Sequence, residues 1–377
     1  MLLKNLVLKH FRNYTDIELE CSTRLNIFWG ANAQGKSNLL EAIYYLGYGR
    51  SYRLAPDEQV LQWDRPSFVI RATVLQDFNL SSIDITYVRD AKKKVTRFNG
   101  KKISRLAELG RIFPVVLFSP DDLQLTKGAP NFRRHYLDSL LSRLYPEYEV
   151  TYQRYQQVLS QRNYLLRLRD TTSNRSLLET YDQQLSQQGA KILTFRFNLL
   201  PLLSHNLKNY YREIAGKDEE LSLFYSSSLN NSFTTEPNID SLTLNILDKL
   251  SQLRSLDYQK GATSIGPHRD DLIFRIKGKN LRHYGSQGQH RSLVLALRLS
   301  ELTIMDEHLA NRPVLLLDDV LSELDDNRCY SLIKMLESER QVFLTTTSPD
   351  NIPEDLIHHA ANYQVSAGFI KPNFWKR

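Results

Sequence analysis

The spacing of apolar positions changes twice along the 377-residue chain. Residues 1 to about 110 contain strand-like runs such as 68–74, with a single helical pattern after residue 37. From 132 to 215, apolar residues recur every three or four positions, which predicts helices. Strand-like runs resume at 220–227 and 271–277. The pattern predicts an α/β protein whose two halves, distant in sequence, flank a helical insertion.

Pro201 lies inside the helical stretch. An unbroken helix over 177–211 would extend roughly 50 Å. Because proline lacks an N–H group and its ring collides with the preceding turn, we expect a kink or an end there, and a compact helical lobe without a long coiled coil. The expected division is 1–112, an α/β segment; 113–262, a mostly helical inserted lobe; and 263–377, which completes the α/β part.

Segment 30–37 has the sequence Gly-Ala-Asn-Ala-Gln-Gly-Lys-Ser, which matches the phosphate-binding pattern G-x-x-x-x-G-K-S. It follows the apolar run 25–29 and precedes a helical pattern. Backbone N–H groups would converge on phosphate oxygens, Lys36 would contact the β and γ phosphates, and Ser37 would bind Mg²⁺. The structural alternative is a glycine-rich turn with a solvated lysine. The predicted nucleotide contacts are Gly30, Ala31, Asn32, Ala33, Gln34, Gly35, Lys36 and Ser37.

A second half of the site is predicted nearly three hundred residues later. The apolar run 314–317 ends in Asp318 and Asp319, as a buried strand of the Walker B type does. Asp318 would join Ser37 at Mg²⁺, and Asp319 is placed to act as a base or to orient water at the γ-phosphate. We therefore predict ATP and Mg²⁺ as cofactors, with Lys36, Asp318 and Asp319 as catalytic residues.

A serine and a glycine stand at the start of the helical pattern 291–301. Backbone donors and the helix dipole at such a start could meet a γ-phosphate. The alternative is an ordinary serine N-cap after a glycine turn. The segment lies about 30 residues before the Walker B pattern, as the signature does in ATP-binding-cassette ATPases, which favours the nucleotide interpretation. The candidates are Ser286, Gln287, Gly288 and Gln289.

Positive charge is concentrated in one stretch. Between Lys92 and Arg134, eleven Lys or Arg oppose three acids, a local balance of +8 in a chain of net charge +7. This stretch favours a polyanion such as DNA. The alternative is a solvated hairpin, because Asn99-Gly100 is a type I′ turn signal. The candidate DNA contacts are Lys92, Lys93, Lys94, Lys101 and Lys102, with Arg50 and Arg53, which follow the phosphate-loop helix and could touch DNA or nucleotide.

No run of eighteen apolar residues occurs, and the N-terminus is basic where a signal peptide needs an apolar core. We expect a cytoplasmic protein that does not associate with a membrane. Cys21 and Cys329 have no metal-binding spacing and are expected to be buried thiols.

Several motifs together resemble ATP-binding-cassette heads of the SMC type and, more narrowly, the RecF family of bacterial recombination-mediator ATPases. The resemblance covers essentially the whole chain, in order. It rests on 286–289, 315–319 and the D-loop pattern 322–325, and on 8–14, 49–53, 118–123 and 265–271.

The resemblance implies an ATP-binding-cassette-type P-loop ATPase head with an antiparallel β subdomain and an inserted helical lobe. It places Arg12 and Asn13 at the nucleotide. It implies an ATP-dependent homodimer, in which the signature of one copy faces the ATP of the other, and binding to single-stranded DNA, gaps and junctions of single- and double-stranded DNA. The implied partners are RecO, RecR and RecA, in DNA repair, replication and the SOS response to DNA damage.

Three positions depart from the wider cassette pattern. Asp319 stands where glutamate is usual and is one methylene shorter, so we expect slow hydrolysis, with ATP acting mainly as a dimerisation switch. Residues 345–348, Thr-Thr-Thr-Ser, stand in place of a switch histidine and allow a hydroxyl-type phosphate sensor. The Q-loop contact stays open between Gln124 and 119–122.

His268 is expected to have a structural or phosphate-side role.

Two other functions fit part of this pattern. An ATPase subunit of a membrane transporter would share the nucleotide site but not the basic stretch. A nucleotide kinase would share the phosphate loop but would leave 286–289 unexplained.

Overall fold

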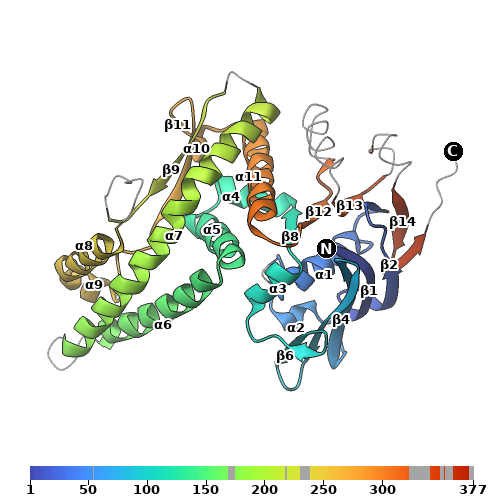
Figure 1. Ribbon diagram of the computed structural model, residues 1–377, viewed down its shortest axis with the longest axis horizontal. Helices are drawn as coiled ribbons and strands as arrows, with labels where there is room; N and C mark the ends of the chain where they lie inside the picture. Colours follow the sequence, from blue (N-terminus) through green and yellow to red (C-terminus); the bar gives the residue numbers. More distant parts are fainter. Residues whose placement is uncertain are drawn as a thin grey trace. The chain divides into compact units, whose positions relative to one another are not determined.

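The computed structural model describes residues 1–53, 55–168, 175–216, 219–229, 238–321, 340–348, 352 and 360–372. The chain packs into two compact units, one formed by Met1–Asp122 with Leu297–Arg377 and the other by Leu123–Ala296. The division falls inside helix α11, Gln287–His308 (Figure 1). The D-loop pattern 322–325 lies outside the described residues.

A mainly parallel sheet forms the centre of the first unit, with strand order β15-β14-β3-β13-β12-β8. Only the edge pair β14–β15 is antiparallel. Strands β3, β13, β12 and β8 are mostly apolar and buried, as parallel strands are. Their bounds are β3 Leu25–Trp29, β8 Val115–Phe118, β12 Val314–Asp318, β13 Val342–Thr346, β14 Ala361–Ser366 and β15 Phe369–Pro372.

An antiparallel sheet with strand order β2-β1-β4-β5-β6-β7 accompanies it. The strand expected at 68–74 is confirmed as part of β4, and it pairs with β5. The Asn99-Gly100 turn is confirmed between β6 and β7, with φ of +47° and +76°. The bounds are β1 Leu2–Phe11, β2 Tyr14–Glu20, β4 Ser67–Gln76, β5 Asn79–Val88, β6 Lys93–Phe98 and β7 Lys101–Lys102.

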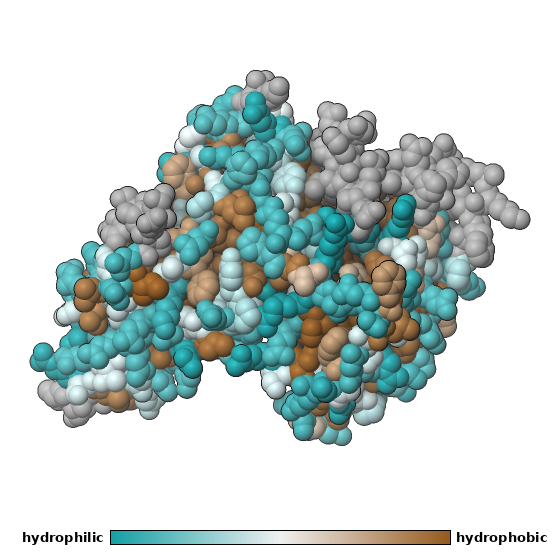
Figure 2. Space-filling model, viewed as in Figure 1, coloured by the Kyte–Doolittle hydropathy of each residue, from teal (hydrophilic) through white to brown (hydrophobic). Residues whose placement is uncertain are grey.

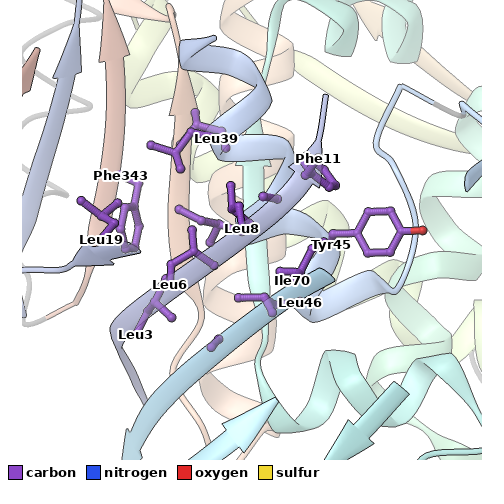
Figure 3. Close-up of a cluster of buried hydrophobic side chains, with 14 of the residues drawn as sticks. Leu3, Leu6, Leu8, Phe11, Leu19, Leu39, Tyr45, Leu46, Ile70 and Phe343 are labelled. Carbon is purple, nitrogen blue, oxygen red and sulfur yellow. The ribbon is translucent and has the colours of Figure 1, made fainter. Parts of the chain in front are cut away.

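Helix α1, Lys36–Tyr48, shares one apolar core with both sheets of this unit. Figure 3 shows Leu8 of β1, Leu46 of α1, Ile70 of β4 and Phe343 of β13 within this cluster. All four side chains have at most 1% of their surface exposed. The phosphate-loop helix is therefore fixed by burial along its length. The shorter helices of the unit are α2 Asp57–Val60, α3 Leu106–Ile112 and η1 Pro120–Leu123.

The second unit is mostly helical, as the three-to-four spacing predicts, and carries a small sheet of order β11-β10-β9. Its helices include α4 Gln124–Lys127, α5 Pro130–Leu144, α6 Pro146–Leu168, α7 Arg175–Ala215, α8 Ile239–Gln252, α9 Arg254–Lys260 and α10 Leu281–Tyr284. Its strands are β9 Leu221–Ser226, β10 Asp271–Ile276 and β11 Lys279–Asn280.

Helix α7 does not end at Pro201. It continues through this residue for 41 residues in all. Pro201 lies on the exposed face, while apolar side chains on the other face, including Leu199 and Leu203, are buried. Burial along the whole helix outweighs the local cost of the proline.

The three-part division 1–112, 113–262 and 263–377 rests on periodicity and stays a prediction, because the two units are defined by packing. On the face drawn in Figure 2, apolar side chains occur in separate groups among hydrophilic ones. Within the described residues, no helix combines the length and apolar character that a membrane crossing requires.

Candidate nucleotide-binding site

The loop between β3 and α1 requires glycine at both of its ends. Gly30 has φ of +156°, and a Cβ atom there would lie 2.3 Å from the carbonyl oxygen of Val365. Gly35 has φ of +118°, and a Cβ atom would lie 2.5 Å from Asn13 Nδ2. Any side chain would therefore collide with a neighbour and strain the backbone. The two glycines therefore allow the loop to pack closely against Val365 and Asn13.

Two neighbouring turns hold the loop at Gln34. The carbonyl oxygen of Gln34 accepts hydrogen bonds from Asn13 Nδ2 at 3.0 Å and from the Gly368 N–H at 3.1 Å. Its side-chain oxygen accepts from the Ala367 N–H at 2.7 Å. The Tyr14 hydroxyl donates to the Gly35 carbonyl at 3.0 Å. The sequence resemblance places Asn13 at the nucleotide. It assigns no such role to Tyr14 or to Ala367-Gly368, because nothing in their local sequence indicates a contact with the phosphate loop.

Lys36 lies over the phosphate loop. Its ammonium donates to the carbonyl oxygens of Gly30 at 2.6 Å and Ala31 at 2.8 Å. Burial lowers the pKa of Lys36, while the nearby carboxylates of Asp319 and Asp318 act in the opposite direction. An anion bound in the loop would stabilise the charged amine, as the predicted phosphate contact requires.

Three hydroxyl groups converge on Asp318 at the carboxyl end of β12. Ser37 donates to Oδ1 at 2.7 Å, Thr345 donates to the same oxygen at 2.9 Å, and Tyr52 donates to Oδ2 at 2.9 Å. The side chains come from α1, β13 and the loop after α1, and they meet because parallel strands present their carboxyl ends at one edge. An all-oxygen set with one carboxylate suits Mg²⁺. Ser37 and Asp318 thus fit the predicted metal pair.

Asp319 follows β12 in the left-handed region, with φ of +51°. Its N–H donates to the Thr345 hydroxyl at 2.9 Å. Thr345 is the first of the hydroxyl residues proposed in place of a switch histidine, and it is fully buried in β13. It therefore ties the carboxylate of Asp318 and the backbone N–H of Asp319 to the neighbouring strand.

Glu41, buried on α1, organises the arginines beside the loop. Arg12 donates to its two carboxylate oxygens at 2.7 and 3.0 Å. Arg53 lies 3.7 Å from one of them and donates to Asn38 Oδ1 at 3.1 Å. The guanidinium of Arg53 also lies over the Tyr52 ring, 5.3 Å from its centroid. Arg12 and Arg53 thus belong to the surroundings of α1.

The N-terminus of α11 forms a reciprocal capping box. Gln289 N–H donates to the Ser286 hydroxyl at 3.2 Å, and the Ser286 N–H donates to Gln289 Oε1 at 2.9 Å. Gln289 Nε2 also donates to Glu219 at 2.9 Å. Ser286 and Gln287 are exposed and Gly288 is half-buried. The N-cap geometry is therefore present, and a role of this segment toward a nucleotide stays a proposal.

The lysines of the basic hairpin fall into two groups. Lys92, Lys93, Lys101 and Lys102 are exposed. Lys94 points inward, because alternation along β6 puts it on the core face, and its ammonium contacts Asp57 at 2.8 Å and the Gly49 carbonyl at 2.7 Å. Lys94 thus serves the packing of the hairpin against α1. Arg50 is half-buried.

Two other candidates from the sequence, Asp122 and His268, make hydrogen bonds with residues of their own units. Asp122 is buried and paired with Arg298, while Gln124 is exposed; the Q-loop contact stays open. His268 accepts or donates at Nδ1 with the Tyr155 hydroxyl, 2.6 Å away. Burial lowers the pKa of His268 to about 4. Its contacts are those of a structural residue.

A parallel sheet with this loop and with Asp318 at its carboxyl edge defines a nucleotide-binding protein of the P-loop class. The family model described as the RecF/RecN/SMC N-terminal domain matches residues 2–366. The chain belongs to this family and, within it, to the RecF family of DNA replication and repair proteins.

Relatives and solved structures agree. The "DNA replication and repair protein RecF" of Clostridium tetani is 37% identical, covering 98% of this chain and 99% of that protein. The protein of the same description from Streptococcus suis is 40% identical, covering 97% and 99%. A structure of the recombination mediator protein RecF with ATP in the RecFOR pathway has a TM-score of 0.91 at 35% identity, covering 99% and 98%.

An Smc head domain from Pyrococcus furiosus matches with a TM-score of 0.55 at 15% identity, covering 98% of this chain and 95% of that chain. At this identity the likeness concerns the fold alone. The expected cassette-type head with an antiparallel sheet and an inserted helical lobe is confirmed.

Proposed function

We propose that this protein is an ATP-gated DNA-binding protein of recombinational repair. It binds ATP and Mg²⁺ at segment 30–37 with Asp318, and ATP joins two copies of the chain. The observation that carries the proposal is the hydrogen bond of 2.7 Å from Ser37 Oγ to Asp318 Oδ1, directly after the glycine loop. A solved RecF relative carries ATP, which supports the choice of nucleotide.

Dimerisation uses the exposed start of α11. Ser286 and Gln287 present a helix N-terminus to solvent, where backbone donors favour an anion. In the proposed dimer this end meets the γ-phosphate held by the other copy. By linkage, ATP stabilises the dimer by the same factor by which the dimer tightens ATP, and hydrolysis releases both.

DNA binds through the exposed lysines of the hairpin, Lys92, Lys93, Lys101 and Lys102, whose charge suits a phosphate backbone. The preferred DNA would be single-stranded DNA, gaps and junctions with duplex. In this proposal the protein acts with RecO and RecR to load RecA in repair, replication and SOS induction. The RecFOR description of a similar solved protein supports the pathway.

Sizing in solution tests the proposal. The full chain is measured with and without ATP and Mg²⁺, and we expect a dimer only with both. Lys36→Met should lose ATP binding and the dimer, whereas Ser286→Arg should keep ATP binding and lose the dimer. Gln252→Arg adds the same charge at an exposed position of α8 and should dimerise normally. An ATP-driven dimer of Ser286→Arg would contradict the proposed geometry.

The transporter-subunit alternative is not favoured by the relatives, which are named for DNA replication and repair. DNA affinity measured against salt separates the two functions. For a DNA-binding protein, the logarithm of the binding constant falls linearly with log[salt], because contacts with phosphates release counterions. A transporter subunit would show little DNA affinity at any salt concentration.

A further inference from the structure

The turn between β4 and β5 holds a phenylalanine that both the backbone and water disfavour. Gln76 pairs with Asn79, so Asp77 and Phe78 form a two-residue turn. Their φ angles are +46° and +65°, the left-handed pattern of a type I′ turn, which prefers Asn-Gly. For a bulky residue such a φ is a strained outlier. Phe78 is also 99% exposed.

The next turn at the same end of the sheet has the relaxed sequence, Asn99-Gly100. This turn is tied to β5: the Asn99 N–H donates to the Ser82 carbonyl at 2.9 Å, and the Ser82 N–H donates to Asn99 Oδ1 at 2.7 Å. The sheet therefore does not require an aromatic residue at either turn. A strained backbone at an exposed aromatic residue indicates that the Phe78 ring contacts a ligand and does not stabilise the fold.

Exposed cations lie on the neighbouring β6–β7 hairpin. Arg97 pairs with Lys102, and Phe98 pairs with Lys101; Arg97 and both lysines are exposed. Asn99 Nδ2 donates to Ser81 Oγ at 3.2 Å, and Phe78 is three residues beyond Ser81, about 10 Å along a strand. Bases in B-DNA repeat every 3.4 Å or so along one strand. The ring is therefore about three base steps from the end of the basic hairpin.

We propose that Phe78 stacks on the exposed terminal base of a duplex, at a junction of double- and single-stranded DNA, while Arg97, Lys101 and Lys102 hold phosphates about three base steps away. The inference rests on the proposed DNA-binding function and adds the site that selects a junction. In continuous duplex each base face is covered by its neighbour, whereas a junction offers a free face to an aromatic ring. The three cations fit a polyanion and not an apolar protein surface.

The test compares two DNAs with the full chain, in ATP and Mg²⁺. The first is a duplex closed by a hairpin loop at each end. The second is the same duplex with one end opened into a single-stranded extension and with 2-aminopurine at the junction. We expect Phe78→Ala to lower the affinity for the junction about tenfold, the effect of losing one stacked base. Affinity for the closed duplex and the salt slope should stay unchanged, because stacking releases no counterions. Phe78→Trp should retain the junction preference and the quenching of 2-aminopurine.

Trp63→Ala is the matched control, since Trp63 is another exposed aromatic residue, 89% accessible, away from the β4–β5 turn. It should leave both affinities unchanged. Equal losses on both DNAs, or an unchanged junction preference in Phe78→Ala, would overturn the inference while the DNA-binding function stands. If the unaltered protein binds neither DNA in a salt-dependent way, the proposed function itself fails and the inference with it.

Discussion

The Tyr52 hydroxyl donates a hydrogen bond of 2.9 Å to Oδ2 of Asp318, the oxygen that neither Ser37 nor Thr345 contacts. The Tyr52 ring also packs edge-on against Tyr44, with centroids 5.6 Å apart. Burial raises the pKa of Tyr52 far above its usual value, so the hydroxyl keeps its proton and remains a donor. Tyr52 thus fixes the orientation of the carboxylate proposed to bind Mg²⁺.

Tyr52→Phe should weaken Mg²⁺ binding, because partners that orient a metal ligand contribute about 10- to 100-fold to metal affinity. The ring and its packing are retained, so ATP binding without Mg²⁺ should be unchanged. The measurement is a Mg²⁺ titration of ATP-driven dimerisation followed by sizing. Tyr44→Phe is the control, since it keeps the aromatic contact. An unaltered Mg²⁺ midpoint would show that Tyr52 does not position Asp318.

Lys94→Met should destabilise the first unit by about 1–3 kcal/mol, since it leaves the partly buried Asp57 without its cation. The side chains of Lys94 and Asp57 are 19% and 23% exposed. Lys93→Met, at the neighbouring exposed position, should change the free energy of unfolding by less than about 0.5 kcal/mol. Urea denaturation of both variants gives the comparison. Equal effects would show that the inward contact of Lys94 contributes nothing.

Acid should destabilise the second unit through His268. Its Nδ1 is hydrogen-bonded to the Tyr155 hydroxyl, 2.6 Å away, and its Nε2 lies 3.3 Å from the Thr263 carbonyl. Burial lowers the folded-state pKa to about 4 from 6.5. Below pH 6.5 the unfolded chain therefore binds a proton that the folded chain does not, and stability falls until about pH 4. The loss attributable to this group is at most about 3 kcal/mol.

His268→Gln removes this titration. The free energy of unfolding, measured from pH 7 to pH 4, should fall less steeply in the variant than in the unaltered protein. His205→Gln is a suitable control, because His205 is exposed on α7 and should leave the slope as it is. Parallel pH profiles of the unaltered and His268→Gln proteins would contradict the prediction.

Local chemistry accounts for what the sequence predicted. Three features depend only on neighbouring residues and could therefore be located from sequence. They are the glycine loop at 30–37, the apolar strand that ends in Asp318, and the turn at Asn99-Gly100. Tyr52 and Thr345 could not be linked to Asp318, since only the folded chain brings the loop after α1 and strand β13 to the end of β12. Burial along α7 overrode the helix-breaking tendency of Pro201. Lys94 was grouped with the outward lysines although alternation along β6 turns it inward.

Asp319→Asn should separate ATP hydrolysis from dimerisation. The left-handed φ of +51° suits both Asp and Asn, and the N–H that donates to Thr345 is retained, so the fold should be undisturbed. Loss of the carboxylate should lower the rate of hydrolysis by about 10²- to 10⁴-fold, the contribution of a positioned base. Since Asp318, the proposed Mg²⁺ ligand, is unchanged, the ATP-driven dimer should form and persist. Phosphate release and sizing over time are the measurements, with Asp318→Asn as the control that should lose Mg²⁺-dependent dimerisation. Hydrolysis at the unaltered rate in Asp319→Asn would exclude this carboxylate as the base.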